Sequence, residues 1–137
     1  MDIARTLSTL PFNELLGIEV TEAADGRAHG EIAFDDKLHS VEGVAHGAVA
    51  YALADTVGVA AVLSEGYRVA PTIDMRIDYL APVTGAIEAT ATVARLGGSV
   101  AVVDIDVTEK ESERVATARG VYKTGGDGSG SAWDPES

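Results

Sequence analysis

One long apolar run constrains the fold of this chain more than any other segment. Residues 46–63 read HGAVAYALADTVGVAAVL, in which small and apolar side chains occupy almost every position. A run of this length and composition predicts a helix that is buried on nearly every side. Asp55 interrupts the run, and a chain that keeps a carboxylate in such surroundings usually has a use for it, because burying an unpaired carboxylate is unfavourable. Asp55 is therefore the first candidate for a catalytic role.

The composition limits the classes of protein to which the chain can belong. It has 137 residues, no cysteine and a net charge of −12 at pH 7. The length fits one domain, and the missing cysteine excludes disulfides, thiolate zinc sites and a cysteine nucleophile. An acidic surface repels phosphate backbones, so nucleic acid is not an expected partner. The excess of acidic residues would suit a salt-adapted protein as well as an ordinary acidic one.

Neither a targeting segment nor a metal site is expected. The N-terminal residues, MDIARTLSTLP, lack a basic region followed by an apolar stretch, and the long apolar run contains Asp55. We therefore expect no signal peptide, no membrane partner and a cytoplasmic location. His29, His39 and His46 do not follow the spacing of metal ligands, so no metal is predicted.

The segments before the apolar run predict two short helices, a hairpin and a polar, irregular loop. They cover residues 2–10, 12–16, 18–34 and 35–45. Asp2 can cap the first helix, and Asp25-Gly26 is a favoured turn between two strands. The N-terminal half therefore predicts a strand pair that a polar loop connects to the long helix.

After the apolar run, four segments alternate between polar and apolar residues with a period of two. They are residues 72–79, 85–95, 99–108 and 114–123. Turn residues separate them, so the pattern predicts an antiparallel meander. In the first strand, Thr72 is expected on the face opposite Met75. Residues 125–137 are rich in Gly, Ser and acidic residues and are expected to be a disordered tail.

Together these elements predict an α+β architecture. A single antiparallel sheet would curl around one central helix of about 27 to 30 Å. Because the helix is apolar all round, its remaining side should meet another element or a second subunit. A homodimer or homotetramer is therefore expected.

The loop and the start of the long helix carry a recognisable motif. Residues 38–56 read LHSVEGVAHGAVAYALADT, which resembles the pattern Asn-x-x-Gly-x-x-His-Gly-Gly, followed by a helix with Leu-x-Asp, of hotdog-fold acyl-CoA thioesterases of the PaaI type. Gly43, His46, Gly47 and Asp55 match the spacing. Residues 72–83 are also similar to this family, and they contain its Tyr-x-x-Pro motif at residues 79–82. The resemblance implies a single hotdog domain over residues 1–124.

Two positions depart from the family pattern. Ser40 stands in place of the Asn that helps to hold the thioester, and Ala48 stands in place of the second Gly. A serine hydroxyl can donate a hydrogen bond but reaches less far than an asparagine amide. These departures bear on the identity of the substrate.

The resemblance implies a role for each matching residue. The Gly47 N–H would polarise the thioester carbonyl, as suits the first turn of a helix. Asp55 would be a general base or a nucleophile, and the Thr72 hydroxyl would orient the water or the carboxylate. Gly43 and Ala48 would contact the substrate. For His46, a catalytic role and a purely structural one are equally open.

The substrate implied is an acyl-CoA, with coenzyme A as part of the substrate and no separate cofactor. Arg95, Gly97 and Gly98 offer one cation and flexible N–H groups to its phosphates, although a plain hairpin turn explains them equally well. At 1.5 Å per residue, Gly47 and Asp55 lie about 12 Å apart on one helix. One helix therefore cannot place both on one carbonyl, whereas two antiparallel helices of a dimer can.

Three alternatives stay open at this point. Asp55 could instead be a structural carboxylate paired with Arg76 or Thr56. The chain could be a non-catalytic module that binds acyl-CoA. An enoyl-CoA hydratase on the same fold is a further alternative, but the Asp and His pair of a hydratase helix is not found.

Overall fold

The computed structural model describes residues 2–67, 70–109 and 113–124. The tail expected at residues 125–137 lies outside the described residues, as does part of the turn expected at residues 111–113. The helices are α1 (Ile3–Ser8), α2 (Pro11–Leu16), the short 3-10 helix η1 (Asp36–Leu38) and α3 (Gly47–Leu63). The strands are β1 (Ile18–Ala24), β2 (Arg27–Ile32), β3 (His39–Val41), β4 (Val44–Ala45), β5 (Thr72–Tyr79), β6 (Ile87–Leu96), β7 (Val100–Glu109) and β8 (Glu113–Lys123).

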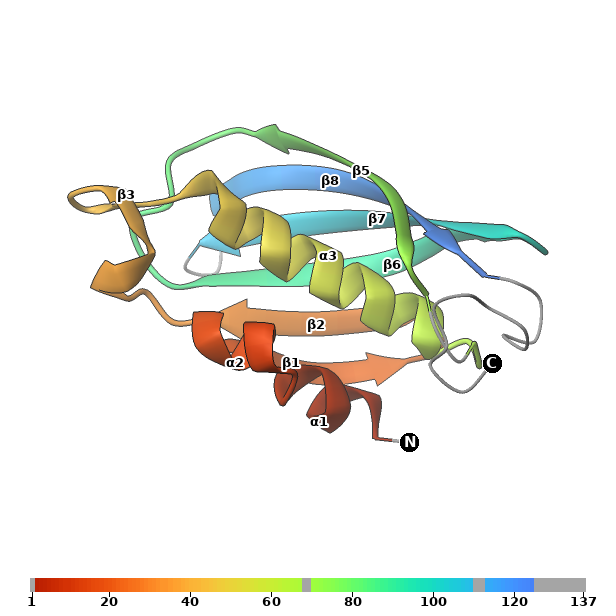
Figure 1. Ribbon diagram of the computed structural model, residues 1–137. Helices are drawn as coiled ribbons and strands as arrows, with labels where there is room; N and C mark the ends of the chain where they lie inside the picture. Colours follow the sequence, from red (N-terminus) through yellow and green to blue (C-terminus); the bar gives the residue numbers. More distant parts are fainter. Residues whose placement is uncertain (1, 68–69, 110–112, 125–137) are drawn as a thin grey trace.

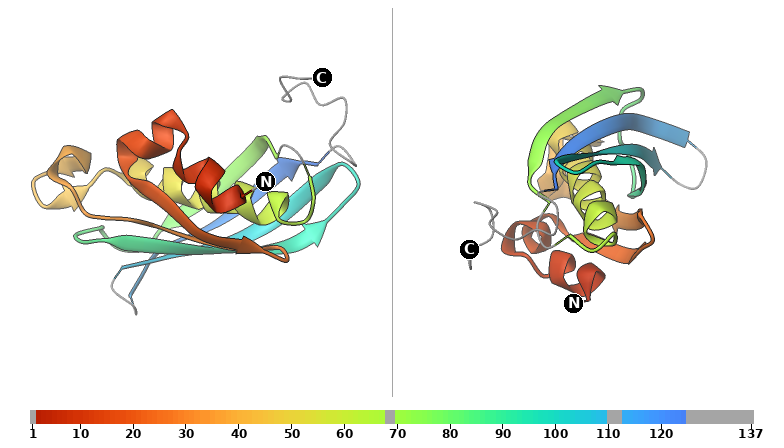
Figure 2. Two further views of the ribbon diagram at one scale, coloured as in Figure 1. Left: turned by 90° about the horizontal axis from the view of Figure 1, so that it is seen from below. Right: turned by 90° about the vertical axis from the view of Figure 1, so that its right-hand side faces the viewer.

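One six-stranded antiparallel sheet curls around α3 (Figure 1). The strand order is β1-β2-β6-β7-β8-β5, and α1 and α2 lie beside β1. In the end-on view of Figure 2 the sheet wraps around α3, which leaves one side of the helix uncovered between β5 and the N-terminal helices. This is the predicted α+β hotdog architecture.

Local sequence signals explain where the N-terminal elements begin and end. The Asp2 carboxylate accepts a hydrogen bond from the Arg5 N–H at 3.1 Å, as a helix cap does. Gly17 ends α2 with a φ of 79°, which favours glycine. Asp25 and Gly26 both have positive φ, as a tight hairpin turn requires. The two short helices and the hairpin agree with the prediction.

The predicted meander is wrong in one respect. Strands β6, β7 and β8 are consecutive neighbours, but β5 pairs with β8 at the far edge and not with β6. The link of residues 80–86 is longer than a hairpin turn, and it can cross the end of the sheet over three strand spacings, about 14 Å. The Leu80 N–H donates to the Val115 carbonyl at 2.8 Å and the Ala45 N–H to the Val83 carbonyl at 2.9 Å, which holds the link across this end.

Two smaller expectations also need correction. Residues 35–45 are not irregular throughout, because they form η1 and a small hairpin of β3 and β4. Thr72 does not lie opposite Met75, because the β5–β8 register shifts between Thr72 and Asp74. The extra residue, Ile73, is 55% exposed, and the bulge turns Thr72 toward α3.

The core depends on the close approach of Tyr122 to α3. Tyr122 is fully buried, and its ring lies against two glycines, Gly58 on α3 and Gly120 on its own strand. A Cβ on Gly58 would lie 2.8 Å from the Tyr122 Cζ and closer still to the hydroxyl, and one on Gly120 would lie 2.5 Å from the ring. Both positions therefore need glycine because the aromatic ring occupies the space of a side chain.

We expect Gly58→Ala to destabilise the protein by about 2 kcal/mol, because the added methyl must displace a buried ring from a packed core. The measurement is chemical denaturation. Gly98→Ala is the control, because a Cβ there meets no atom within 4 Å, and it should leave the midpoint nearly unchanged. An unchanged midpoint for Gly58→Ala would mean that the ring can move freely.

Candidate active site

Asp55 is half-buried on the middle of α3, and two hydroxyl groups donate to its carboxylate. The Thr72 hydroxyl donates to Oδ1 at 2.7 Å and the Tyr122 hydroxyl donates to the same atom at 3.2 Å. The expectation of a deeply buried, unpaired carboxylate is therefore wrong, because α3 has an uncovered side. The carboxylate is oriented from the sheet and faces that uncovered side.

The structural alternatives for Asp55 are not found. Arg76 pairs with Asp78 at 3.2 Å on the outer face of the sheet. The Thr56 hydroxyl donates to the Ala52 carbonyl at 2.8 Å and to Asn13 at 3.5 Å. Within the described residues, Asp55 has no cationic partner. It is a carboxylate held by neutral donors.

Tyr122 is kept in its protonated form. Burial raises the pKa of its hydroxyl well above the usual range, and the negative charge of Asp55 adds to the effect. The hydroxyl therefore acts toward Asp55 as a hydrogen-bond donor only. The sequence pattern does not predict a site role for Tyr122, because strand alternation alone does not indicate which helical side chain it reaches.

The N-terminus of α3 is exposed and presents a free backbone donor. His46 caps the helix, with its Nδ1 accepting from the Ala48 N–H at 2.9 Å. The Gly47 N–H donates to no acceptor among the described residues. The first turn of α3 thus offers one unpaired N–H at the positive end of the helix dipole. The observed capping contact is the structural alternative considered for His46.

Tyr79 packs over Gly47 and was missed as a site residue. Its hydroxyl donates to the Gly47 carbonyl at 2.8 Å, and a Cβ on Gly47 would lie 3.3 Å from its ring. Burial raises the pKa of the Tyr79 hydroxyl, with a further contribution from Tyr51. Its place in the Tyr-x-x-Pro end of β5 was the available signal. An open groove of about 370 Å³ begins here, lined by Gly47, Tyr79, β4 and residues 80–83.

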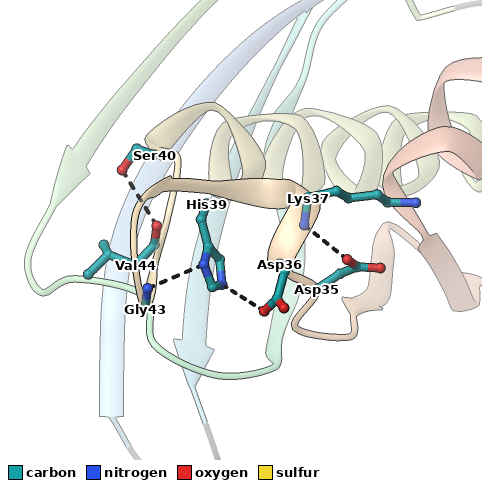
Figure 3. Close-up of polar contacts among 7 residues, drawn as sticks. All are labelled: Asp35, Asp36, Lys37, His39, Ser40, Gly43 and Val44. Carbon is teal, nitrogen blue, oxygen red and sulfur yellow. Dashed lines mark hydrogen bonds and ion pairs between the residues drawn. The ribbon is translucent and has the colours of Figure 1, made fainter.

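Ser40 and Gly43 lie in the small hairpin that precedes α3 (Figure 3). The Ser40 hydroxyl points across the hairpin toward the Val44 carbonyl, at 3.5 Å. Gly43 has a φ of 83°, which favours glycine, and its N–H donates to His39 Nδ1 at 3.2 Å. Both residues are exposed. The hairpin that carries them leads directly into the N-terminal end of α3.

Arg95, Gly97 and Gly98 lie at the opposite end of the sheet from Gly47. A row of paired residues crosses the sheet beside this turn, from β6 through β7 and β8 to β5: Leu96, Ala101, Tyr122 and Thr72. Because Tyr122 and Thr72 contact Asp55, the turn lies next to the row of residues that reaches Asp55. Arg95 is exposed. The Gly97 N–H is not available to a ligand as predicted, because it donates to the Val100 carbonyl at 2.9 Å within the turn. The Thr124 hydroxyl donates to the Gly97 carbonyl at 3.1 Å. One chain therefore places the predicted residues in two groups, one around Gly47 and one around Asp55.

Comparison with known proteins identifies the family. Residues 42–116 match the family model described as the thioesterase superfamily. The chain belongs to the thioesterase superfamily. The match runs from the β3–β4 hairpin through α3 to β8, so it includes both Gly47 and Asp55 of this thioesterase, whereas Ser40 and Tyr122 lie outside it.

Several relatives resemble this thioesterase over most of its length. A Halobacterium salinarum protein named provisionally as an esterase is 36% identical in a match that covers 79% of this chain and 80% of the relative. A medium/long-chain acyl-CoA thioesterase of Salmonella typhimurium is 27% identical in a match that covers 85% of this chain and 86% of the relative. The structure of Escherichia coli PaaI, from the phenylacetic acid degradation operon, has a TM-score of 0.81 at 25% identity and covers 88% of both chains.

The predicted fold and family are therefore confirmed, and the thioesterase is a thioester hydrolase. Among the helices of residues 2–67, 70–109 and 113–124, none has the length and hydropathy to cross a bilayer. No cluster of three or more potential metal ligands lies in that described part of the chain.

Proposed function

We propose that this thioesterase hydrolyses an acyl-CoA to a free acid and coenzyme A, using Asp55 of one subunit and the Gly47 N–H of another. The observation that carries the proposal is the Asp55 carboxylate, which lies on an otherwise apolar helix, half-buried, and is held by Thr72 and Tyr122. The acyl-CoA thioesterase of Salmonella typhimurium supports the substrate class.

In the general-base route, Asp55 removes a proton from a water molecule as the water oxygen adds to the thioester carbonyl carbon. The carbonyl oxygen becomes an oxyanion, and the Gly47 N–H stabilises it at the positive end of α3. Collapse of the tetrahedral intermediate breaks the C–S bond. The thiolate of coenzyme A leaves and takes the proton back from Asp55.

In the nucleophilic route, an Asp55 oxygen attacks the carbonyl carbon and coenzyme A leaves as the thiolate, which gives a mixed anhydride that water then hydrolyses. If this water attacks the Asp55 carbonyl of the anhydride, its oxygen stays in Asp55, and a single turnover in ¹⁸O-water detects it by mass spectrometry. We expect no label in the peptide that contains Asp55 if water attacks the thioester directly. Label in that peptide would assign the nucleophilic route.

The site is completed by a second copy of the chain. Gly47 and Asp55 are separated by about 12 Å along α3. The two groups of one chain therefore cannot both contact the same thioester. Antiparallel packing of two α3 helices through their uncovered sides would bring the Gly47 of each toward the Asp55 of the other. Tyr51, on this side of α3, is 38% exposed, which supports contact with a second subunit.

The remaining candidate residues would hold the ends of the substrate. Ser40, Gly43 and Ala48, which are exposed just before and at the start of α3, would contact the thioester group. His46 would orient the start of the helix through the Ala48 N–H. The open groove beside Gly47 and Tyr79 would receive an apolar part of the substrate. Arg95, with the Gly98 N–H, would contact the phosphates of coenzyme A. The Gly97 N–H is already used, because it donates to the Val100 carbonyl at 2.9 Å.

The test is release of free thiol from short, medium, long and phenylacetyl acyl-CoAs, at low salt and at molar salt. We expect turnover of at least one class, with the salt optimum showing whether the acidic surface is an adaptation to salt. Measurable binding without turnover of any acyl-CoA at either salt would favour the non-catalytic binding module instead.

A further inference from the structure

We infer that Tyr122 is a positioning residue that holds Asp55 Oδ1 together with Thr72 and so leaves Oδ2 as the reacting oxygen. This inference rests on the catalytic role proposed for Asp55. Nothing in the sequence pattern assigned Tyr122 a function, and its ring would otherwise be read as a core side chain.

The hydrogen bonds of the Asp55 carboxylate are unequally distributed between its two oxygens. Oδ1 accepts from the Thr72 hydroxyl at 2.7 Å and from the Tyr122 hydroxyl at 3.2 Å. Oδ2 accepts from no donor among the described residues. Two donors on one oxygen restrict rotation of the carboxylate, and the unshared oxygen is left to accept a proton or to attack a carbonyl carbon.

The hydroxyl of Tyr122 cannot easily move away from Asp55. The ring is fully buried and lies between Gly58 and Gly120, where it occupies the space that a Cβ would take. The hydroxyl also lies 3.5 Å from the backbone carbonyl of Asp55, so it follows the helix as well as the carboxylate. Thr72 and Tyr122 are paired neighbours on β5 and β8. The sheet thus supplies both donors from adjacent strands.

The chemistry of the phenol suits a positioning role. Its raised pKa keeps the proton on the hydroxyl in the neutral and mildly alkaline range, where it can donate to Asp55 but cannot accept the proton of a water. Donation to the carboxylate favours the charged form, which is the form that acts as a base or a nucleophile. Tyr122 therefore supports the reaction through Asp55 without touching the substrate.

The test is Tyr122→Phe, which keeps the ring and removes only the hydroxyl. We expect kcat to fall about tenfold with little change in KM, and the acidic limb of the pH profile of kcat to move to higher pH. The limb moves in this direction because a carboxylate that loses a donor takes up a proton more readily. Tyr67→Phe is the matched control and should change neither quantity. Thermal melting checks that both variants fold.

A second substitution keeps the inference testable if the Phe variant does not fold. With 3-fluorotyrosine at position 122 the hydroxyl is a stronger donor, so the acidic limb should move to lower pH, opposite to the Phe variant. If the acidic limb of the kcat pH profile coincides with that of the wild type in each variant that folds, the positioning role is overturned. In that event, Asp55→Asn still separates the two proposals: lost turnover retains the catalytic role of Asp55, and retained turnover rejects it.

Discussion

Replacement of Asp55 by Asn should lower kcat by about a thousandfold, within the range that a lost general base or nucleophile produces. The asparagine is nearly isosteric and its amide oxygen can still accept from Thr72 and Tyr122. It can neither take a proton from water nor form an anhydride. The measurement is the initial rate of thiol release with the best acyl-CoA, over a range of substrate concentrations.

The control for charge is Asp106→Asn on the outer face of the sheet. Asp106 lies 3.4 Å from Arg114 and is half-exposed, so its loss removes the same charge without approaching α3. We expect wild-type turnover for this variant. Binding of a non-hydrolysable acyl-CoA analogue should persist in Asp55→Asn. If Asp55→Asn keeps more than a tenth of the wild-type kcat, Asp55 is not the catalytic carboxylate.

Replacement of Gly47 by Pro should lower kcat by about a hundredfold or more, as removal of one oxyanion donor does. Proline at the first position of a helix removes the backbone N–H but is compatible with helical geometry. The matched control is Gly47→Ala, which adds the same Cβ, 3.3 Å from the exposed Tyr79 ring, and retains the N–H. A loss shared equally by both variants would assign the effect to crowding and not to the donor.

These two variants also test the shared site. If Asp55 and Gly47 act across a subunit interface, an exchanged equimolar mixture of Asp55→Asn and Gly47→Pro contains mixed dimers with one intact site and one doubly defective site. Random assortment should then restore about a quarter of the wild-type activity. Native mass spectrometry shows whether the subunits have exchanged. If they have exchanged and the mixture stays inactive, both groups of one site belong to a single chain.

Features encoded by neighbouring residues were predictable from the sequence. The long helix was expected over residues 46–63 and extends over Gly47–Leu63, with His46 as its cap. The Asp25-Gly26 turn also follows from local preference, since both residues adopt the positive φ that such turns require. The motif around Gly43, Gly47 and Asp55 identified the family, whose fold is confirmed.

What the sequence did not predict depends on contacts between distant residues. The pairing of β5 with β8 joins residues that are 37 positions apart at Tyr79 and Ala116 and 50 apart at Thr72 and Tyr122. Strand alternation does not indicate which strand will be the partner. The face of Thr72 depended on a register shift that the pattern of side chains does not mark. Tyr122 reaches Asp55 across 67 positions, and only the three-dimensional packing shows that two glycines make room for it.

The bulge in β5 has a consequence for solubility. Strand β5 is an edge strand, and an unbroken edge can pair with the strand of another molecule and begin aggregation. The shift between Thr72 and Asp74 interrupts the regular ladder at one end of this edge, and the opposite edge strand, β1, carries a shift between Val20 and Glu22. The irregularity that turns Thr72 toward Asp55 thus also shortens the surface available for unwanted strand pairing.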